Sequence, residues 1–280
     1  MEIIDSHHHF WHYDPVTYEW IDDRMAVIQR DFLPEHFKPV LQENRVSGTI
    51  AVQADSSVAE THFLLEKAKE NEFIKGVVGW IDLRSDTLEQ KLDALEHETK
   101  LVGFRHIVQG EPDPLFVLDP KFRRGLEMIF ERGYRYDLLI YPHQLISALE
   151  LIRHFPEEPI VIDHIAKPFI AHRYIDGWAI MMREIAKYEH VHCKVSGMIT
   201  EADWAAWQPA DIHPYLDVVT ECFSPDRLMY GSDWPVLNVA GNYEQVIDLV
   251  LDYVRDWSEE DQGQIMGQTA RSFYLSNHKQ

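Results

Sequence analysis

Three consecutive histidines stand near the start of the chain, in the run DSHHHFW at residues 5–11. In an extended strand, residues two apart point to the same face, so His7 and His9 are expected to project together and His8 to the other side. Imidazole is a common ligand of zinc and similar divalent ions. A hydrogen-bonded pair or the remnant of a purification tag would give the same pattern, so it does not by itself establish a metal site.

Further histidine and aspartate residues follow later apolar segments. His143, His164 and Asp233 could join His7 and His9, because two histidines, a third from another strand and one carboxylate make a mononuclear metal site with room for water. A carboxylate at this place could also accept a proton from that water. The alternatives are a helix N-cap for the aspartate and a buried histidine bonded to a backbone carbonyl. The whole set predicts a divalent metal site.

Other polar and aromatic residues at the segment ends are candidates for substrate binding. Arg105 and His106 lie where one apolar segment turns polar, and arginine suits a carboxylate or a hydroxyl-rich ligand, although an internal ion pair is equally open. Trp11 starts an aromatic loop that either walls a pocket or covers the end of the fold. The remaining candidates for substrate binding are Gln53, Tyr141, Lys167 and Trp234.

These side chains need a scaffold that brings many segment ends together. Eight apolar segments are expected as strands: Ile3–Ser6, Gly48–Ala54, Gly76–Ile81, Leu101–Val108, Tyr136–Tyr141, Pro159–Asp163, Val191–Val195 and Arg227–Gly231. Their near-continuous apolar character is typical of parallel strands buried on both faces. Helical patterns cover Val58–Asn71, Asp86–Glu98 (from a D-x-x-E start) and Asn242–Trp257, and Ser258 begins a terminal helix.

The alternation of strands and helices favours an α/β fold, a single (β/α)8 TIM-like barrel that spans residues 1–280. A doubly wound open sheet is the alternative. In a barrel, the C-terminal ends of the strands carry the active site. The candidate residues follow the apolar segments, so the barrel would gather them at one rim.

Composition narrows the class of partner. The net charge of -21, from 26 basic and 47 acidic residues, argues against nucleic acid and against an anionic membrane surface. The two cysteines make no disulfide framework, and the polar N-terminus does not resemble a signal peptide. We expect a cytoplasmic protein with a small-molecule substrate and no membrane partner, and a homo-oligomer is left open.

Several motifs in this order resemble the amidohydrolase superfamily, and most closely its amidohydrolase-2 type. This group includes L-fuconolactone and L-rhamnonolactone hydrolases and the 2-pyrone-4,6-dicarboxylate lactonases. The motifs are DSHHHFW at 5–11, GFRHIVQGEPD at 103–113, LDPKFRRGLE at 118–127, YDLLIYPHQL at 136–145, VIDHIAKP at 161–168, CKVSGMITEADW at 193–204 and YGSDWPV at 230–236. The resemblance implies a distorted barrel of the amidohydrolase type.

The resemblance also implies a ligand set and a reaction. It maps the metal ligands onto His7, His9, His143 and Asp233, and a further strand-end histidine onto His164. Binuclear members carry a lysine on the fourth strand that GFRHIVQ lacks, so one divalent ion, with zinc as first choice, or no metal is expected.

The implied enzyme is a hydrolase that acts on a carboxylic ester and opens a sugar-acid lactone of the L-fucono or L-rhamnono type. Asp233 would take the proton of the attacking water, and His164 or Arg105 would stabilise the oxyanion. The alternatives are a metal-free pyrone dicarboxylate lactonase, a decarboxylase of the same superfamily, and a barrel that only binds a ligand.

Overall fold

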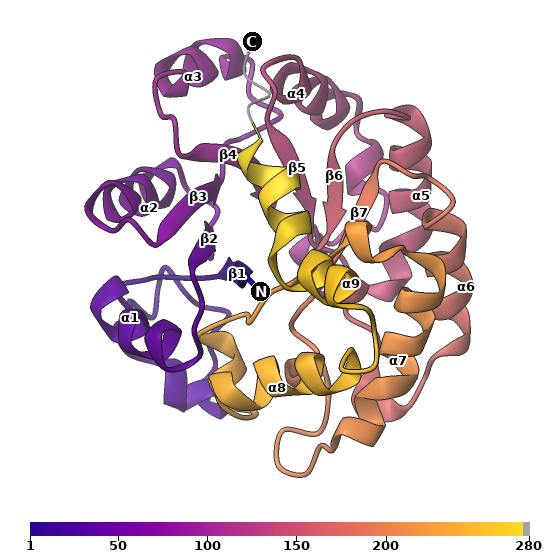
Figure 1. Ribbon diagram of the computed structural model, residues 1–280. Coiled ribbons are helices and arrows are strands. Elements are labelled where there is room, and N and C mark those ends of the chain that lie inside the picture. The colour runs from indigo at the N-terminus through magenta and orange to yellow at the C-terminus, as the bar shows by residue number, and fades with distance from the viewer. Residues whose placement is uncertain (277–280) are drawn as a thin grey trace.

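The computed structural model describes residues 1–276 and arranges eight strands in one sheet, in the order β1 to β8 (Figure 1). The strands are β1 (Ile4–His8), β2 (Gly48–Val52), β3 (Ile74–Gly79), β4 (Leu101–His106), β5 (Arg135–Leu138), β6 (Ile160–Ile162), β7 (Val191–Val195) and β8 (Leu228–Tyr230). All seven neighbouring pairs are parallel. All eight predicted strands are present, with ends that differ by at most three residues.

The sheet closes on itself between its first and last strands. The backbone N–H of His9 donates to the carbonyl of Trp234 over 2.7 Å, and that of Asp233 donates to the carbonyl of His7 over 2.8 Å. A parallel bridge joins His8 to Trp234 at the same place. The predicted barrel is therefore confirmed, and the open doubly wound sheet is not the fold.

Helices follow the strands and surround the barrel (Figure 1). They are α1 (Pro34–Glu43), α2 (Val58–Glu70), α3 (Leu88–Leu95), α4 (Pro120–Glu131), α5 (Leu145–His154), α6 (Asp176–Ile185), α7 (Pro209–Cys222), α8 (Tyr243–Tyr253) and α9 (Glu259–Gly263). The predicted helix at 86–98 is shorter than expected because Thr87, not Asp86, takes the N-cap position. Within residues 1–276, no helix combines the length and apolar character that crossing a membrane requires.

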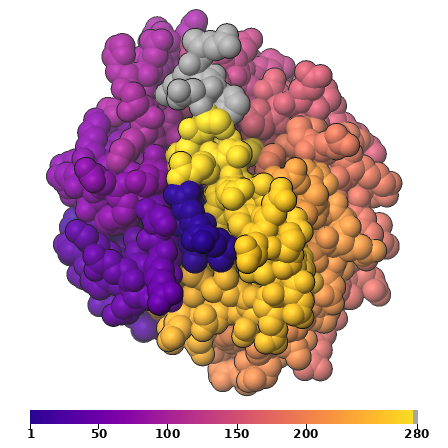
Figure 2. All heavy atoms as spheres, in the orientation of Figure 1, coloured from indigo at the N-terminus to yellow at the C-terminus, as the bar shows by residue number. Residues whose placement is uncertain are grey.

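The C-terminal segment closes the end of the barrel where the strands begin. After α9, two π-helical stretches, Gln264–Gln268 and Arg271–Leu275, run across this end beside the N-terminus (Figures 1 and 2). Gly267 must be a glycine, because a Cβ there would lie 2.5 Å from the carbonyl oxygen of Glu2. Phe273 and Tyr274 pack against the barrel interior with Ile4 and other apolar strand residues. The opposite, C-terminal end is left for a site.

The single-domain assignment for residues 1–280 stays our proposal, and its last four residues, 277–280, lie outside the described part.

One buried carboxylic acid ties α2 to the loop that follows β2. Glu60 is 5% exposed, accepts the backbone N–H of Ala54 and accepts the hydroxyl of Tyr18 over 3.1 Å. Ser57 caps the same turn by accepting the N–H of Glu60. Burial raises the pKa of Glu60 from its ordinary 4.5 to about 7.

This shift predicts a pH dependence of stability. The folded protein keeps the Glu60 proton up to about pH 7, while the unfolded chain releases it near 4.5, so the stability that the proton provides is lost as the pH rises through 7. Glu60→Gln should lack this loss and gain about 3 kcal/mol relative to wild type between pH 5 and pH 8. Urea unfolding at both pH values measures the difference. The exposed Glu66→Gln in the same helix is the control, and equal pH dependence in both variants would contradict the assignment.

Candidate active site

Two of the three consecutive histidines face the inside of the barrel at its C-terminal end. The Nε2 atoms of His7 and His9 lie 3.3 Å apart, and both side chains are buried. His8 lies on the other face, where its Nε2 shares a hydrogen bond of 2.9 Å with Thr49 Oγ1 and its ring contacts Phe37. The alternation predicted for this strand is confirmed.

Asp233 and His164 join this pair from β8 and β6. Asp233 Oδ1 lies 3.3 Å from His9 Nε2, and 4.0 Å from Nε2 of both His7 and His164. Both residues have a left-handed backbone, with φ of 62° for Asp233 and 53° for His164. Such backbones are uncommon for residues other than glycine and concentrate at functional sites. The turn after each strand therefore aims its side chain at the barrel axis.

The hydrogen-bond partners and burial define the protonation states. His9 Nδ1 lies 2.8 Å from the carbonyl oxygen of Val52, which can only accept, so Nδ1 carries the hydrogen and Nε2 is a free electron pair. Burial lowers the pKa of His9, and lowers that of His164 to about 3, so both are neutral at pH 7. Burial alone would raise the pKa of Asp233, but His164 and His9 together bring it below its ordinary value.

The site therefore brings several nitrogen and oxygen atoms that can offer electron pairs close together. His9 Nε2 and the Asp233 carboxylate face each other across 3.3 Å, an arrangement that needs a cation between or beside them. One ligand atom each from His7, His164 and Asp233 lies within 4.8 Å of the others. Neutral imidazoles and an ionised carboxylate are the states in which these groups bind a divalent metal.

His143 is not placed with the other predicted ligands. Its side chain is exposed, and its ring lies beside that of Tyr141, with centroids 6.2 Å apart. The predicted strand ran to Tyr141, whereas β5 ends at Leu138 and a 3-10 turn, Pro142–Gln144, carries His143 outward. Within residues 1–276, the structure groups His164 with His7 and Asp233 instead.

Arg105 and Gln53 are bound into the barrel wall rather than open to a substrate. Arg105 is 3% exposed, and its Nη1 donates to Asp163 Oδ2 over 2.9 Å and lies 3.1 Å from His7 Nε2. Its Nη2 donates to the backbone and side-chain oxygens of Gln53. Burial opposes ionisation of Asp163, but the neighbouring Lys194, His7 and Arg105 hold its pKa well below its ordinary value. The internal ion pair left open for Arg105 is what the structure shows.

A cation lies near the histidine cluster. Lys167 directly follows the turn of His164, and its Nζ lies 3.1 Å from Glu201 Oε1 and 5.6 Å from the centre of the Tyr141 ring. Nearby Glu201 and Tyr141 raise the pKa of Lys167, although burial alone would lower it. Glu201 was not a candidate from the sequence, because it does not follow an apolar segment directly but ends the 3-10 turn Ile199–Glu201 after β7.

The remaining predicted substrate residues have partners within the protein. His106 Nε2 pairs with Glu111 at 2.6 Å, and its Nδ1 accepts the indole N–H of Trp80. Trp11 is fully buried, with its indole N–H donated to the carbonyl of Arg30, and Trp234 stacks on Phe37 at 4.3 Å. Both tryptophans therefore pack under the barrel rim, and the indole of Trp11 lies nearly parallel to the ring of His9.

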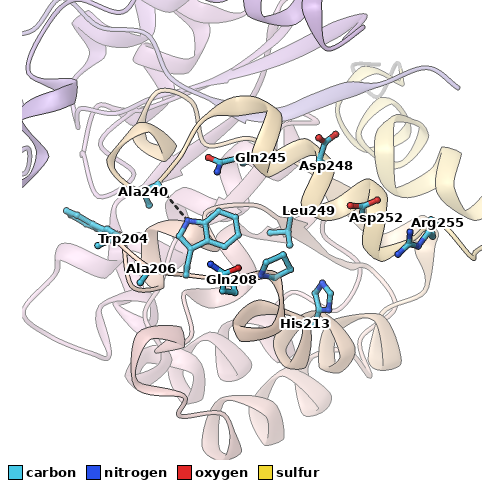
Figure 3. A pocket seen from close by; sticks show the side chains of 13 residues that line it. Trp204, Ala206, Gln208, His213, Ala240, Gln245, Asp248, Leu249, Asp252 and Arg255 are labelled. Carbon is cyan, nitrogen blue, oxygen red and sulfur yellow. Dashed lines mark hydrogen bonds between the residues drawn. The ribbon is translucent and has the colours of Figure 1, made fainter.

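One cavity lies away from this cluster. It has a volume of about 650 Å³ and opens between the loop at Trp204–Gln208 and α8 (Figure 3). Trp207 donates its indole N–H to the carbonyl of Ala240 at its wall. None of the four clustered residues lines this cavity. The candidate site is therefore identified by the chemistry of its residues and not by this cavity.

Comparison with known proteins gives one consistent family. A family model described as amidohydrolase matches residues 4–275. A protein from Burkholderia multivorans named L-fucono-1,5-lactonase is 39% identical over 97% of this chain and 95% of its own length. A protein of the same name from Burkholderia ambifaria is 34% identical over 86% of this chain and 82% of its own length.

A solved structure shares the fold closely. It is an amidohydrolase from Burkholderia multivorans with bound zinc, 38% identical to this chain, with a TM-score of 0.93 and coverage of 98% of this chain and 99% of its own.

Proposed function

Because the chain belongs to the amidohydrolase family, we propose that it is a hydrolase that opens a sugar-acid lactone of the L-fuconolactone type. The observation that carries this proposal is the buried cluster of three neutral histidines and one carboxylate at the C-terminal end of the barrel. The two relatives named L-fucono-1,5-lactonase support the substrate class. The L-rhamnono lactone is the neighbouring candidate, since a relative named L-rhamnono-gamma-lactonase is 26% identical over 62% of the chain.

The donor set fits one divalent ion, with zinc as first choice. His7, His9, His164 and Asp233 would hold it, because the free electron pair of His9 Nε2 and the Asp233 carboxylate meet there, and the Nε2 atoms of His7 and His164 lie within 4.0 Å of Asp233 Oδ1. A relative of this family contains zinc. When bound, the ion would lower the pKa of a bound water molecule and polarise the carbonyl group of the lactone. Arg105 Nη1 shares the face of His7 Nε2 and would lie beside the ion.

The reaction needs a base, a stabilised oxyanion and a protonated leaving group. The Asp233 carboxylate takes a proton from water, whose oxygen attacks the lactone carbonyl carbon. The ring C–O bond then breaks, and the proton held on Asp233 returns to the ring oxygen, which leaves as an alcohol. Lactone and water are thus converted to one hydroxy acid. Asp233 is suited to this role because it is ionised and 3% exposed.

Positive groups of the chain itself stabilise the developing charge. Lys167 is close enough to lower the pKa of Asp233 and of His164, and its ion pair with Glu201 holds it there. His164 is neutral and its Nε2 belongs to the ligand set, so we assign it to the metal rather than to the carbonyl oxygen. Arg105 is 3% exposed and contacts the His7 ring, so we assign it to positioning rather than to the oxyanion.

Replacing Lys167 should weaken turnover. Lys167→Met is expected to lower kcat/KM for the lactone by about 10- to 100-fold, because a charge-assisted contact to the substrate is lost. Lys167→Arg should retain more activity, since it keeps the charge. Steady-state kinetics of both variants measure this, and Lys121→Met at an exposed ion pair is the control. Equal rates for Lys167→Met and wild type would exclude Lys167 from the site.

A lactone screen tests the function itself. Acid release from L-fucono-, L-rhamnono- and pyrone dicarboxylate lactones is followed with a pH indicator, with and without added zinc, and carbon dioxide is measured with aromatic acids. We expect rapid hydrolysis of a neutral sugar-acid lactone. Turnover only of the dicarboxylate, or only carbon dioxide release, would overturn the proposal in favour of the two rival enzymes. Binding without turnover of any compound would favour the ligand-binding barrel.

The cellular setting is part of the same proposal. A cytoplasmic location fits the two free cysteines, Cys193 and Cys222, of the described chain. A homo-oligomer stays open, and light scattering of the purified protein would determine its state.

A further inference from the structure

A fully buried lysine lies on the barrel axis below the histidine cluster. Lys194, on β7, has its Nζ 2.5 Å from Asp137 Oδ2, 3.0 Å from Asp163 Oδ1 and 3.1 Å from His7 Nδ1. All four side chains are 0% exposed. The two carboxylates come from β5 and β6, so three neighbouring strands and β1 meet at this ammonium group.

The three groups around Lys194 form a ligand set of their own. One atom each from His7, Asp137 and Asp163 lies within 4.8 Å of the others, as in a site that could hold a metal ion. The Nζ contacts every member of that set, so the ammonium occupies the centre where an ion would bind. A lone cation would not be stable here in an apolar barrel, and the two carboxylates balance Lys194 and Arg105.

The C-terminal segment completes this network from below. The hydroxyl of Tyr274 donates to Asp137 Oδ1 over 2.8 Å, and leaves Oδ2 for Lys194. On the other side, His7 presents Nδ1 to Lys194 and Nε2 to the histidine cluster. The same ring therefore separates two cation positions, one closed below it and one open toward the barrel mouth.

We propose that Lys194 is a built-in cation that fills the position between His7, Asp137 and Asp163, so that the barrel can hold only one exchangeable metal ion, above His7. This inference does not depend on the lactonase proposal, since stability and metal content test it without any substrate. It also gives His7 a fixed orientation, because its lower nitrogen is held between Lys194 and Asp163.

Two variants of Lys194 distinguish the effect of losing its charge from the effect of emptying the space that it fills. Lys194→Ala removes the ammonium and leaves room for an ion, whereas Lys194→Met removes the same charge and fills the room. In the absence of metal, both substitutions should lower the Tm by roughly 10 °C or more, because the buried carboxylates of Asp137 and Asp163 lose their cation. Each protein, with wild type, is refolded with and without zinc, freed of loose metal by desalting, and assayed for Tm and for zinc per chain.

We expect wild type to saturate at one zinc per chain and Lys194→Ala to take up one more, with a zinc-dependent rise in Tm that Lys194→Met does not share. Lys194→Ala that folds only in the presence of zinc would also support the proposal. Equal zinc content and equal Tm response in the two variants would overturn it. So would a second tightly held zinc in wild type, a measurement that does not depend on how the variants fold.

Discussion

Asp233→Asn is expected to lower kcat for lactone hydrolysis by about 1,000-fold, the range lost when a positioned general base is removed. The amide keeps the shape of the side chain and one oxygen toward His9, but it cannot take a proton from water. The turn should survive, because Asp233 holds its backbone through its own N–H to the carbonyl of His7. Steady-state kinetics and the Tm of the variant measure both effects.

A second strand-end carboxylate provides the matched control. Asp82 follows β3, is half-buried and caps its own turn by accepting the N–H of Arg84. Asp82→Asn makes the same chemical change outside the cluster and should leave kcat within about twofold of wild type. If Asp233→Asn kept wild-type kcat, or if both variants lost equal activity, Asp233 would not be the base.

Much of the fold could be predicted because the pattern of apolar residues that marks a buried strand lies within a few consecutive residues. A parallel strand covered by helices on one side and the barrel core on the other must be apolar nearly throughout, so segments such as VVGWI and IVI stand out. Strand geometry likewise separated His8 from its neighbours, since the alternation of side chains is fixed by the backbone. These inferences need no knowledge of what lies opposite each strand.

The structure differs from the sequence prediction where a strand stops. The segment YDLLIY is apolar to Tyr141, yet β5 leaves the sheet at Leu138, and the side chain of Gln144 closes the turn by accepting the N–H of Tyr141. A glutamine three residues after the end of an apolar segment is only a weak indication in a sequence that the strand has already ended. The sequence therefore put His143 just past a strand end, whereas β5 ends at Leu138, and the structure groups His164 with His7 and Asp233.

Pairing across the barrel is the part that the sequence does not reveal. Lys194 and Asp137 are 57 residues apart and Arg105 and Asp163 are 58 apart, and each looked like an isolated polar residue within or after an apolar strand. Only the closed order of the strands brings them together. Glu201 and Lys167 meet for the same reason, through loops that follow adjacent strands.

Substitution of neighbouring histidines gives the sharpest test of the metal site. His9→Asn removes one free electron pair from the cluster while its amide can still donate to the carbonyl of Val52. We expect zinc affinity and kcat each to fall by more than about 100-fold. Replacing a residue that only hydrogen-bonds to a metal ligand typically costs about 10- to 100-fold, and losing the ligand itself should cost more. Zinc per chain, Tm and kcat of the purified protein are the measurements.

His8→Asn on the same strand is the control, and it distinguishes an effect on the metal site from an effect on stability. His8 bonds Thr49 and packs on Phe10 and Phe37, so its loss should cost about 1–3 kcal/mol of stability. Its ring points away from the cluster, so zinc content and kcat per folded molecule should stay near wild type. A loss of zinc in His8→Asn equal to that in His9→Asn would contradict the site. Zinc retained in His9→Asn with kcat lost would instead mean that His9 is not a ligand and that its ring acts on the substrate.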